Sequence, residues 1–435
     1  MAVASISRSH AQVIPTTREF VLPPWNAQQV FEPTPLPLLT DPDLREEVAP
    51  EDTPVKGRSH PEYQPRGIRY GAWMFHPMAG VGSLYDSNIF ATTNNPQGDV
   101  AARFNTGLSA QSLWERHGID LRATTESTLY ANNSGLNQTD ATLKGTGHYD
   151  VDHSTSILGA FQAAYLHEGV GSLNSPNGAV EPTPYTLFTA DLTGRKEFGR
   201  LTGSLGARID SYDYGSTVAQ NGTILDQSAQ DGQIYTLHSR LDYAFSDKSS
   251  IFAAAEGNSR NLEGSPGQPL SSTGYRVLSG FALQITHLIV GEFGGGYMSQ
   301  QFEDPTIGLI AGPTYEARLT WSPSRVFDVH FNAEQLVTEA SVTSSSGILA
   351  NAVQLGFDYE IRPNVVFSTA GTYETDSFKG EERFDRVYAL NAQLKYLMNN
   401  VTSLSFQYRY FLRDSSIETD TYAKHQVEIN ATARF

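Results

Sequence analysis

The sequence predicts an all-β protein: a closed antiparallel transmembrane β-barrel of about 18 strands, preceded by a disordered proline-rich N-terminal arm. Three observations support this prediction. Apolar and polar residues alternate over many segments of about ten residues, as they do along a transmembrane β-strand. Short and long polar breaks alternate between these segments. No stretch of the 435 residues approaches the run of about 18 apolar residues that a transmembrane helix needs.

The first 70 residues form a region of their own. Half of the 22 prolines fall there, most of them in "LPPWNAQQVFEPTPLPLLTDPDLREEVAPEDTP". This composition favours polyproline II or an unfolded chain over a packed core, so we expect a periplasmic arm over residues 12–70. The small residues Ser9 and Ala11 resemble those before a signal-peptide cleavage point. We interpret residues 1–11 as the remnant of a signal peptide, with an ordinary N-terminal tail as the alternative.

Residues 71–435 follow a period of two, which predicts the barrel. In "NAVQLGFDYEIRPN", Val353, Leu355 and Phe357 alternate with Gln354 and Asp358. The segments "YALNAQLKYL", "SLSFQYRYFL", "HGIDLRATTEST" and "GSLGARIDSY" alternate in the same way. The helical period of about 3.6 residues fits none of these segments.

The breaks between the segments predict the number of strands. Eight short turns alternate with nine longer loops, so that 17 connections join 18 strands. The short turns are "WERH", "DHST", "EFGR", "SDKS", "THLI", "SPSR", "RPNV" and "MNNV". In a closed barrel the periplasmic rim keeps short turns, whereas the loops at the outer rim can grow. A propeller would instead place four short strands in each span of about 40 residues.

Proline positions agree with this assignment, with one exception. Pro176, Pro182, Pro184 and Pro305 fall in predicted loops, because proline cannot donate a hydrogen bond to a β-ladder. Pro77 falls inside the first predicted strand. We therefore expect a bulge or a bend at Pro77.

Composition argues against several functions. The net charge of −17 makes nucleic acid an unfavourable partner. The absence of cysteine removes disulfides and thiolate metal sites. No H-E-x-x-H motif is present, and "GEFGGGY" lacks the Lys and Ser/Thr of a phosphate-binding loop. We expect no cofactor and no metal.

The last segment, "KHQVEINATARF", predicts the closing strand of the barrel. Val427 and Ile429 alternate with polar residues, and the segment ends on Phe435. A final aromatic residue resembles the carboxy-terminal targeting signal of outer-membrane barrels. We interpret Phe435 as an assembly signal for the barrel assembly machinery. Outer-membrane lipid and lipopolysaccharide are the other partners that such a barrel implies.

If the apolar face of each strand meets lipid, the opposite face lines a lumen. Charges of both signs alternate there, which indicates a hydrated pore, and the alternative is that these charges merely pair across strands. The predicted lumen-lining residues are Arg122, Glu126, Arg208, Asp210, Arg240, Asp242, Glu316, Arg318, Asp358, Glu360, Arg362, Lys395 and Arg409. The residues expected in the aromatic girdles at the membrane interfaces are Tyr130, Tyr149, Tyr165, Tyr243, Phe245, Tyr315, Trp321, Tyr396 and Tyr408.

Three segments resemble a known family. They are "PMAGVGSLYDSNIF", "STGYRVLSGFALQITHLIVGEFGGGYMSQQFEDP" and "ARLTWSPSRVFDV". With them, nearly all of residues 72–435 resembles an outer-membrane β-barrel porin family associated with exopolysaccharide loci of Gram-negative bacteria. The resemblance implies a location in the cell outer membrane and a role in polysaccharide export, with polysaccharide or periplasmic export partners.

These observations together predict a porin-like channel or export component of the outer membrane that is linked to surface polysaccharide and is not an enzyme. The first alternative is a closed structural or assembly barrel that recruits periplasmic partners through its N-terminal arm. The second is an outer-membrane hydrolase, for which His153 and Ser154 are adjacent in a turn. "HYDVDHS" places His148, Asp150 and Asp152 on one strand face, but a polar rim explains this pattern better than a metal site does.

Overall fold

The computed structural model describes residues 55, 60–172, 175–176, 178–246, 248–264, 269–286, 288–340 and 346–435. The expected signal-peptide remnant, residues 1–11, lies outside the described residues. So does most of the expected arm over residues 12–70, of which residue 55 and residues 60–70 are described.

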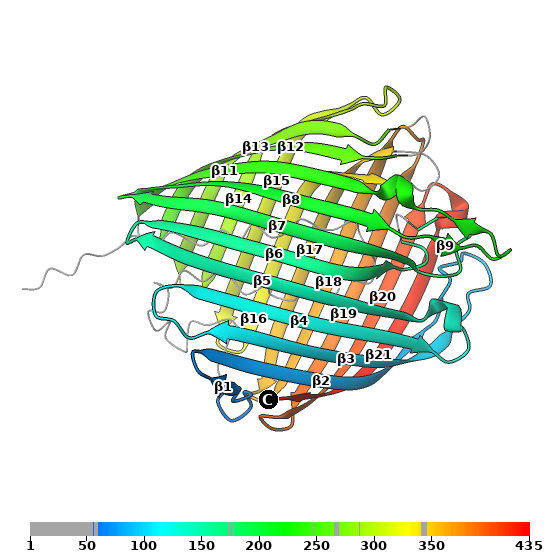
Figure 1. Ribbon diagram of the computed structural model, residues 1–435, viewed down its shortest axis with the longest axis horizontal. Coiled ribbons are helices and arrows are strands. Elements are labelled where there is room, and N and C mark those ends of the chain that lie inside the picture. The colour runs from blue at the N-terminus through cyan, green and yellow to red at the C-terminus, as the bar shows by residue number, and fades with distance from the viewer. Residues whose placement is uncertain are drawn as a thin grey trace, which may run out of the picture.

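Eighteen antiparallel strands close into a single barrel (Figure 1), as the sequence predicts. Closure is made by β2, which pairs with β3 on one side and with the last strand, β21, on the other. The barrel strands are β2 (Trp73–Asp86), β3 (Asp99–Ser112), β4 (Gly118–Tyr130), β5 (Gln138–Asp152), β6 (Thr155–Glu168), β7 (Thr183–Phe198), β8 (Leu201–Tyr214), β11 (Gly232–Ser246), β12 (Ser249–Leu262), β13 (Ser272–Thr286), β14 (Ile289–Phe302), β15 (Leu309–Ser324), β16 (Phe327–Ala340), β17 (Ser346–Arg362), β18 (Val365–Lys379), β19 (Phe384–Leu397), β20 (Thr402–Ser415) and β21 (Tyr422–Arg434).

Short and long connections alternate around the barrel at the predicted positions. The small elements of the described chain lie outside the ladder of long strands. They are β1 (Ile68–Tyr70), the hairpin of β9 (Thr217–Val218) and β10 (Ile224–Leu225), and the 3-10 turns η3 (Ser134–Leu136), η4 (Ser228–Gln230) and η5 (Glu418–Asp420). Because successive strands are antiparallel, all long loops share one rim. In Figure 1 this rim is at the right, around β9.

The outer face of the barrel is apolar. Leu192, Leu205 and Leu237 are each about 60% exposed, and the residues before and after them in their strands point inward. Exposed apolar side chains recur in this way around the wall, which is the pattern of a surface in contact with lipid. Within the described residues, no helix is long and apolar enough to span a membrane.

The expected bulge at Pro77 is wrong. The ladder between β2 and β3 runs through Pro77, paired with Leu108, without a register shift. The Pro77 carbonyl accepts a hydrogen bond from the Phe435 backbone N–H, so this edge of β2 faces the end of the chain. The ladder between β2 and β21 begins only at Met78 and Arg434. Proline is tolerated here because its missing N–H falls where the neighbouring strand stops.

One part of the wall departs from a regular ladder. Pairing of β15 with β16 stops at Glu316 and Glu334, although β15 stays paired with β14 as far as Leu309. Beyond this point β16 and β17 stay paired with each other, and a Cβ atom added at Gly347 of β17 would lie 2.8 Å from the side chains of Phe302 and Ile310. We call this gap between β15 and β16 the seam. Side chains bridge it in place of a backbone ladder, since the Thr314 hydroxyl donates to the Gln335 carbonyl at 3.2 Å.

Candidate functional site: the barrel interior and its outer mouth

The inner face of the barrel carries paired charges. Arg240 of β11 donates to Asp242 at 2.8 Å and to Glu292 of β14 at 2.9 Å. Its guanidinium also lies 3.9 Å from the centre of the Phe252 ring. The contact with Glu292 crosses two intervening strands, β12 and β13, along the inside of the wall. Buried charges are tolerated where partners of opposite sign satisfy them, as they do here.

Most of the predicted lumen-lining residues lie in such pairs. Arg208 binds Asp210 at 2.7 Å, and Arg409 binds Glu428 at 3.0 Å. The other paired members of the set are Glu126 with Arg103, Glu316 with Arg276 at 3.3 Å, Asp358 with His330 at 3.0 Å and Glu360 with His60 at 3.2 Å.

The remaining predicted residues are spread around the wall. Arg122 lies opposite Lys144 and is exposed, and Arg362 is exposed beside the turn that follows β17. Arg318 lies between Glu292 and Asn332 on the neighbouring strands, and Lys395 lies opposite Ser405. The structure does not bring these four cations together, so they form no single cationic cluster.

Two long loops meet at the inner wall near the outer rim. The carbonyl of Gly171, in loop 169–182, accepts hydrogen bonds from Arg413 at 3.0 Å and from the Tyr422 hydroxyl at 2.8 Å. Loop 169–182 starts at β6, whereas Arg413 and Tyr422 belong to β20 and β21, several strands away around the wall. The loop therefore crosses part of the mouth. Its base is fixed by Ser172, which donates to the buried Glu168 at 2.8 Å.

Loop 87–98 folds over the same part of the wall. Ala91 packs on Val387, Ala389, Phe411 and Tyr422. Asn88 anchors this loop, because its amide donates to the Ala423 carbonyl at 3.0 Å. We call the region where loops 87–98 and 169–182 meet β19–β21 the outer mouth.

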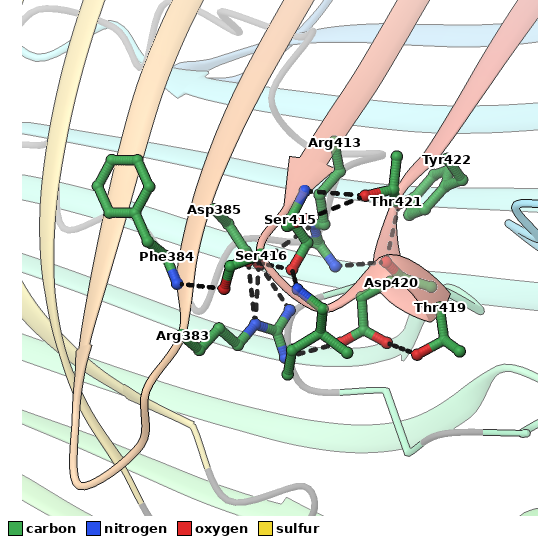
Figure 2. Close-up of polar contacts among 12 residues, drawn as sticks. Arg383, Phe384, Asp385, Arg413, Ser415, Ser416, Thr419, Asp420, Thr421 and Tyr422 are labelled. Carbon is green, nitrogen blue, oxygen red and sulfur yellow. Dashed lines mark hydrogen bonds and ion pairs between the residues drawn. The ribbon is translucent and has the colours of Figure 1, made fainter.

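A charged network lies beside the outer mouth, at the ends of β19 and β20 (Figure 2). Arg383 binds Asp385 at 2.6 Å and Asp420 at 2.9 Å, and Ser415 donates to the fully buried Asp385. Burial alone would lower the pKa of Arg383, but its hydrogen bonds to Asp385 and the nearby carboxylates raise the pKa overall. Arg383 therefore stays charged and holds loop 380–383 against loop 416–421.

Acidic residues dominate the buried charges. The basic residues among them are Arg240, Arg413 and Lys424. The acidic residues among them are Asp86, Asp99, Glu168, Asp210, Asp242, Glu292, Asp304, Asp328, Asp358, Glu360, Glu374, Asp376, Asp385 and Glu428. Arg383, Arg409 and Arg208 are only slightly more exposed, at 11%, 12% and 19%, so the inner wall carries charges of both signs.

The segment before the barrel contacts the inner wall at the opposite rim. The backbone N–H of the buried Val55 donates to Asp328 of β16, and His60 contacts Glu360 of β17 at 3.2 Å. Asp328 lies close to the short turn that precedes β16, and Glu360 lies close to the short turn that follows β17. This part of the N-terminal segment therefore lies inside the barrel mouth at the short-turn rim.

The residues considered for catalysis or metal binding serve the turn after β5. The Ser154 hydroxyl donates to Asp152 at 2.9 Å, and Lys196 donates to Ser154 at 2.8 Å. His148 lies opposite Leu158 on the neighbouring strand. Among the residues that the structure describes, no group of three or more His, Asp and Glu is placed to hold a metal.

Sequence reasoning missed the residues that shape the outer mouth. Gly171, Ala91 and Asn88 lie in loops, where no periodic pattern indicates the direction of a side chain.

Tyr130 was expected in an aromatic girdle, and this is wrong. It shares the inner face of β4 with Thr128, whereas the exposed Leu129 faces outward. The presence of a tyrosine near a strand end is a weak signal, because the face depends on a single step of register.

The fold and this interior define a porin-like β-barrel of the outer membrane, apolar outside and charged inside. The chain matches the family described as "Putative beta-barrel porin 2" over residues 60–435, and it belongs to this family. No curated protein sequence matches the chain.

Several solved structures are similar to the chain. Pseudomonas aeruginosa OpdL is 15% identical, with 83% of this chain and 99% of that chain covered and a TM-score of 0.43. Pseudomonas aeruginosa OccK2 (OpdF) is 10% identical, with 83% and 97% covered and a TM-score of 0.45. A mutant of the ferric enterobactin receptor PfeA, also from Pseudomonas aeruginosa, is 8% identical, with 86% and 81% covered and a TM-score of 0.44.

Proposed function

We propose that this protein is a channel that carries polar solutes through the outer membrane in the service of surface polysaccharide. The observation that carries the proposal is that the outer and inner faces of the closed barrel wall differ in polarity. Exposed Leu, Val, Phe and Tyr side chains cover the outside, and charged pairs such as Arg240 with Glu292 cover the inside. Barrels of 16 to 18 strands are wide enough for an aqueous channel, as a general rule about their size.

In this proposal the predicted lumen-lining residues form the walls of the water-filled path. Pairing keeps the walls hydrated without leaving buried charges unsatisfied. The outer mouth narrows the path, since loop 169–182 is tied to β20 and β21 through Gly171. The link to polysaccharide comes from the family resemblance, and the charged interior suits a hydrated polymer.

A second candidate function is favoured by the contacts of Val55 and His60. In it the N-terminal segment closes the barrel at the short-turn rim, and the protein acts as a structural barrel that engages periplasmic partners. The contact of His60 with Glu360 at 3.2 Å links that segment to the wall. The two functions differ in whether ions pass through the full chain.

Conductance across planar bilayers separates these functions. We would compare the full chain with a variant lacking residues 12–66 and with Glu360→Ala, which keeps the segment in the chain but removes the carboxylate that contacts His60. Steady conductance from the full chain supports the open channel, and passage of neutral polysaccharide would be tested next. Conductance only in the variants supports closure by the segment. If none of the three proteins conducts, and heat-modifiable gel mobility shows that each is folded, the proposed channel function is contradicted.

A further inference from the structure

The seam leaves two strand edges without ladder partners. Over residues 309–315, β15 keeps β14 on one side, and β16 keeps β17, but β15 and β16 do not pair with each other. Phe302 donates its backbone N–H to the Gly308 carbonyl at 2.9 Å, and hydrogen-bonded pairs of an antiparallel ladder recur at every second residue. Even-numbered residues of β15 therefore bond to β14, and its odd-numbered residues, Pro313 and Tyr315 among them, face the seam.

Side chains satisfy polar groups along both of these edges. An open sheet edge is tolerated at membrane depth only where its backbone groups find partners within the protein. Three edge carbonyls each accept a hydrogen bond from a side chain: Tyr315 from Arg276 of β13 at 3.3 Å, Gln335 from Thr314 at 3.2 Å, and Val337 from Arg260 of β12 at 3.1 Å. Pro313, on the same edge, has no N–H that needs a partner. The sequence therefore supports the separation of these strands.

Apolar side chains line the seam. Val337 of β16 packs in one cluster with Ile310 of β15 and Phe302 of β14, and Leu349 of β17 packs against this cluster. Room remains beside it, because a Cβ atom added at Gly312, on the same inner face as Ile310, would meet nothing within 4 Å. The seam is therefore an apolar lining with open space on its inner side.

The seam lies in the outer half of the membrane. β15 begins at the long-loop rim with Leu309, which is 57% exposed on the outer face, and the seam ends at Tyr315. At about 3.4 Å a residue and a tilt of about 40°, this length spans roughly 15 Å of depth, about half of the hydrocarbon core. Alkyl chains of the outer leaflet therefore face the seam along its length.

The contacts across the seam hold it weakly against lipid. Lipid tails are as apolar as leucine, so exchange of the apolar cluster for alkyl chains costs little in a membrane. Between β15 and its neighbours across the seam, the Thr314 hydroxyl donates to Gln335 at 3.2 Å and the Tyr315 hydroxyl donates to Asn351 of β17 at 3.4 Å. Oε1 of Gln335 is buried there and accepts no hydrogen bond from the described residues. A hydroxyl group of a bound molecule would satisfy this acceptor.

We propose that the seam is a lateral opening through which the barrel takes up or releases an amphiphile, with the alkyl chain in the apolar cluster and the polar head in the charged interior. The chain enters between β15 and β16, where no backbone ladder has to break. The head meets the acceptor of Gln335 and the wall beside Arg276 and Glu316, which pair at 3.3 Å. This path runs sideways, so it holds equally for a barrel that the N-terminal segment closes along its axis.

Photolabelling from the lipid phase tests the proposal. The full chain is placed in vesicles that contain a phospholipid with a diazirine at the end of one acyl chain, and the labelled residues are mapped by mass spectrometry. Leu278 of β13 is the internal reference, because it is buried on the inner wall in a separate apolar cluster. We expect the labelling of Val337 and Leu349 to exceed that of Leu278 severalfold.

A reversible lock provides a matched control. The chain contains no cysteine, so Ile310→Cys with Gly347→Cys adds a single disulfide that ties β15 to β17 across the seam. Oxidation should lower the labelling of Val337 severalfold, and reduction should restore it. Thr320→Cys with His330→Cys ties β15 to β16 where the ladder is intact, so its oxidation should leave the labelling unchanged. Heat-modifiable mobility establishes that each variant is folded.

Competition identifies the class of ligand. Dodecyl maltoside below its micellar concentration should reduce the labelling of Val337, and maltose at the same concentration should leave it unchanged. Labelling of Val337 no stronger than that of Leu278, or equal labelling of the oxidised and reduced lock, would overturn the lateral opening. Equal effects of maltose and dodecyl maltoside would overturn the amphiphile as its ligand. These experiments do not measure conductance along the barrel axis, so either failure leaves the proposed channel in place.

Discussion

At the scale of single residues, the outer mouth depends on backbone freedom at Gly171. Its φ of +80° lies in the left-handed region, which residues with a Cβ atom rarely adopt. A Cβ atom added there would lie 2.1 Å from the Cβ of Ala91. Both the conformation and the close approach of loops 87–98 and 169–182 therefore require glycine.

Gly171→Ala should separate these two loops. We expect a cost of about 1–2 kcal/mol from the left-handed backbone, with a further cost of overpacking against Ala91. Gly178→Ala is the matched control, because its φ is also +80° and nothing lies within 4 Å of the added atom. Limited proteolysis should cut loop 169–182 faster in Gly171→Ala alone. Equal cutting in both variants would show that the contact with Ala91 does not hold the loop.

The loop carboxyl of Glu381 supplies a prediction about pH. Burial raises the pKa of Glu381, Arg383 opposes this, and Asp420 and Asp385 add to it. The folded protein therefore binds this proton more tightly than the unfolded chain does. Its contribution to stability is full below the unfolded pKa and is lost as the pH rises through the raised pKa. Glu381→Gln should match the parent in urea unfolding at acidic pH and exceed it at neutral pH. A parent that is equally stable at neutral pH would contradict this assignment.

At the scale of strands, the alternation of faces has a direct energetic consequence. Phe406 of β20 is 47% exposed on the outer face, and the adjacent Ser405 faces inward opposite Lys395 and Asn430. Arginine on the lipid face of a barrel strand costs about 2–4 kcal/mol near the membrane centre.

Phe406→Arg should therefore lower the free energy of unfolding in lipid vesicles by about 2–4 kcal/mol, and Ser405→Arg should cost much less. Urea titrations followed by tryptophan fluorescence would measure both. The inner residue Gln407 is a poorer control, because it is buried and donates to Asn391 at 2.9 Å. Equal losses at positions 405 and 406 would reverse the face assignment.

The seam between β15 and β16 should be visible in the dynamics of the wall. Backbone N–H groups of β15 that find no acceptor on β16 should exchange their protons with solvent more readily than N–H groups that are hydrogen-bonded to a neighbouring strand. Pro313 lies in this half of β15, where proline disrupts least. We expect hydrogen exchange over residues 309–315 to be faster than over residues 316–321. Equal protection in the two halves would mean that β16 pairs with β15 along its whole length in the membrane.

At the scale of the whole molecule, the two ends of the barrel meet in one ladder. Phe435 follows β21, is 53% exposed, and its backbone N–H binds the Pro77 carbonyl of β2. The ladder between β2 and β21 thus joins residues that lie far apart in the sequence. Closure removes the exposed edges that strands of this length would otherwise present.

We interpret the Phe435 side chain as an assembly signal, so Phe435→Ala should lower the yield of folded barrel in the outer membrane. Its exposed ring contributes little to closure, so molecules that do assemble should keep the heat-modifiable mobility of the parent. Phe198→Ala serves as the control, because Phe198 is also exposed, at the end of β7 on the same rim. Equal yields for the two variants would remove the signalling role from Phe435.

The sequence alone determined the number of strands, the order of short and long connections, and the two faces of the wall. These follow from local rules: a period of two places side chains on alternate faces, and polar breaks mark the turns. Arg208, Asp210, Arg240 and Asp242 were predicted to line the lumen in this way, but their pairing along one strand was not predicted and comes from the structure.

Only the tertiary structure decided what fills the barrel. The contact of Gly171 with Arg413, the packing of Ala91 on Phe411 and the docking of His60 on Glu360 join residues hundreds of positions apart or loops without a period. The contacts of these loops depend on closure of the barrel, because β20 and β21 come to lie near loops 87–98 and 169–182 only after the last strand has paired with β2. The same holds for the seam, where Val337 of β16 packs in one cluster with Phe302 and Ile310, because no local pattern encodes such contacts.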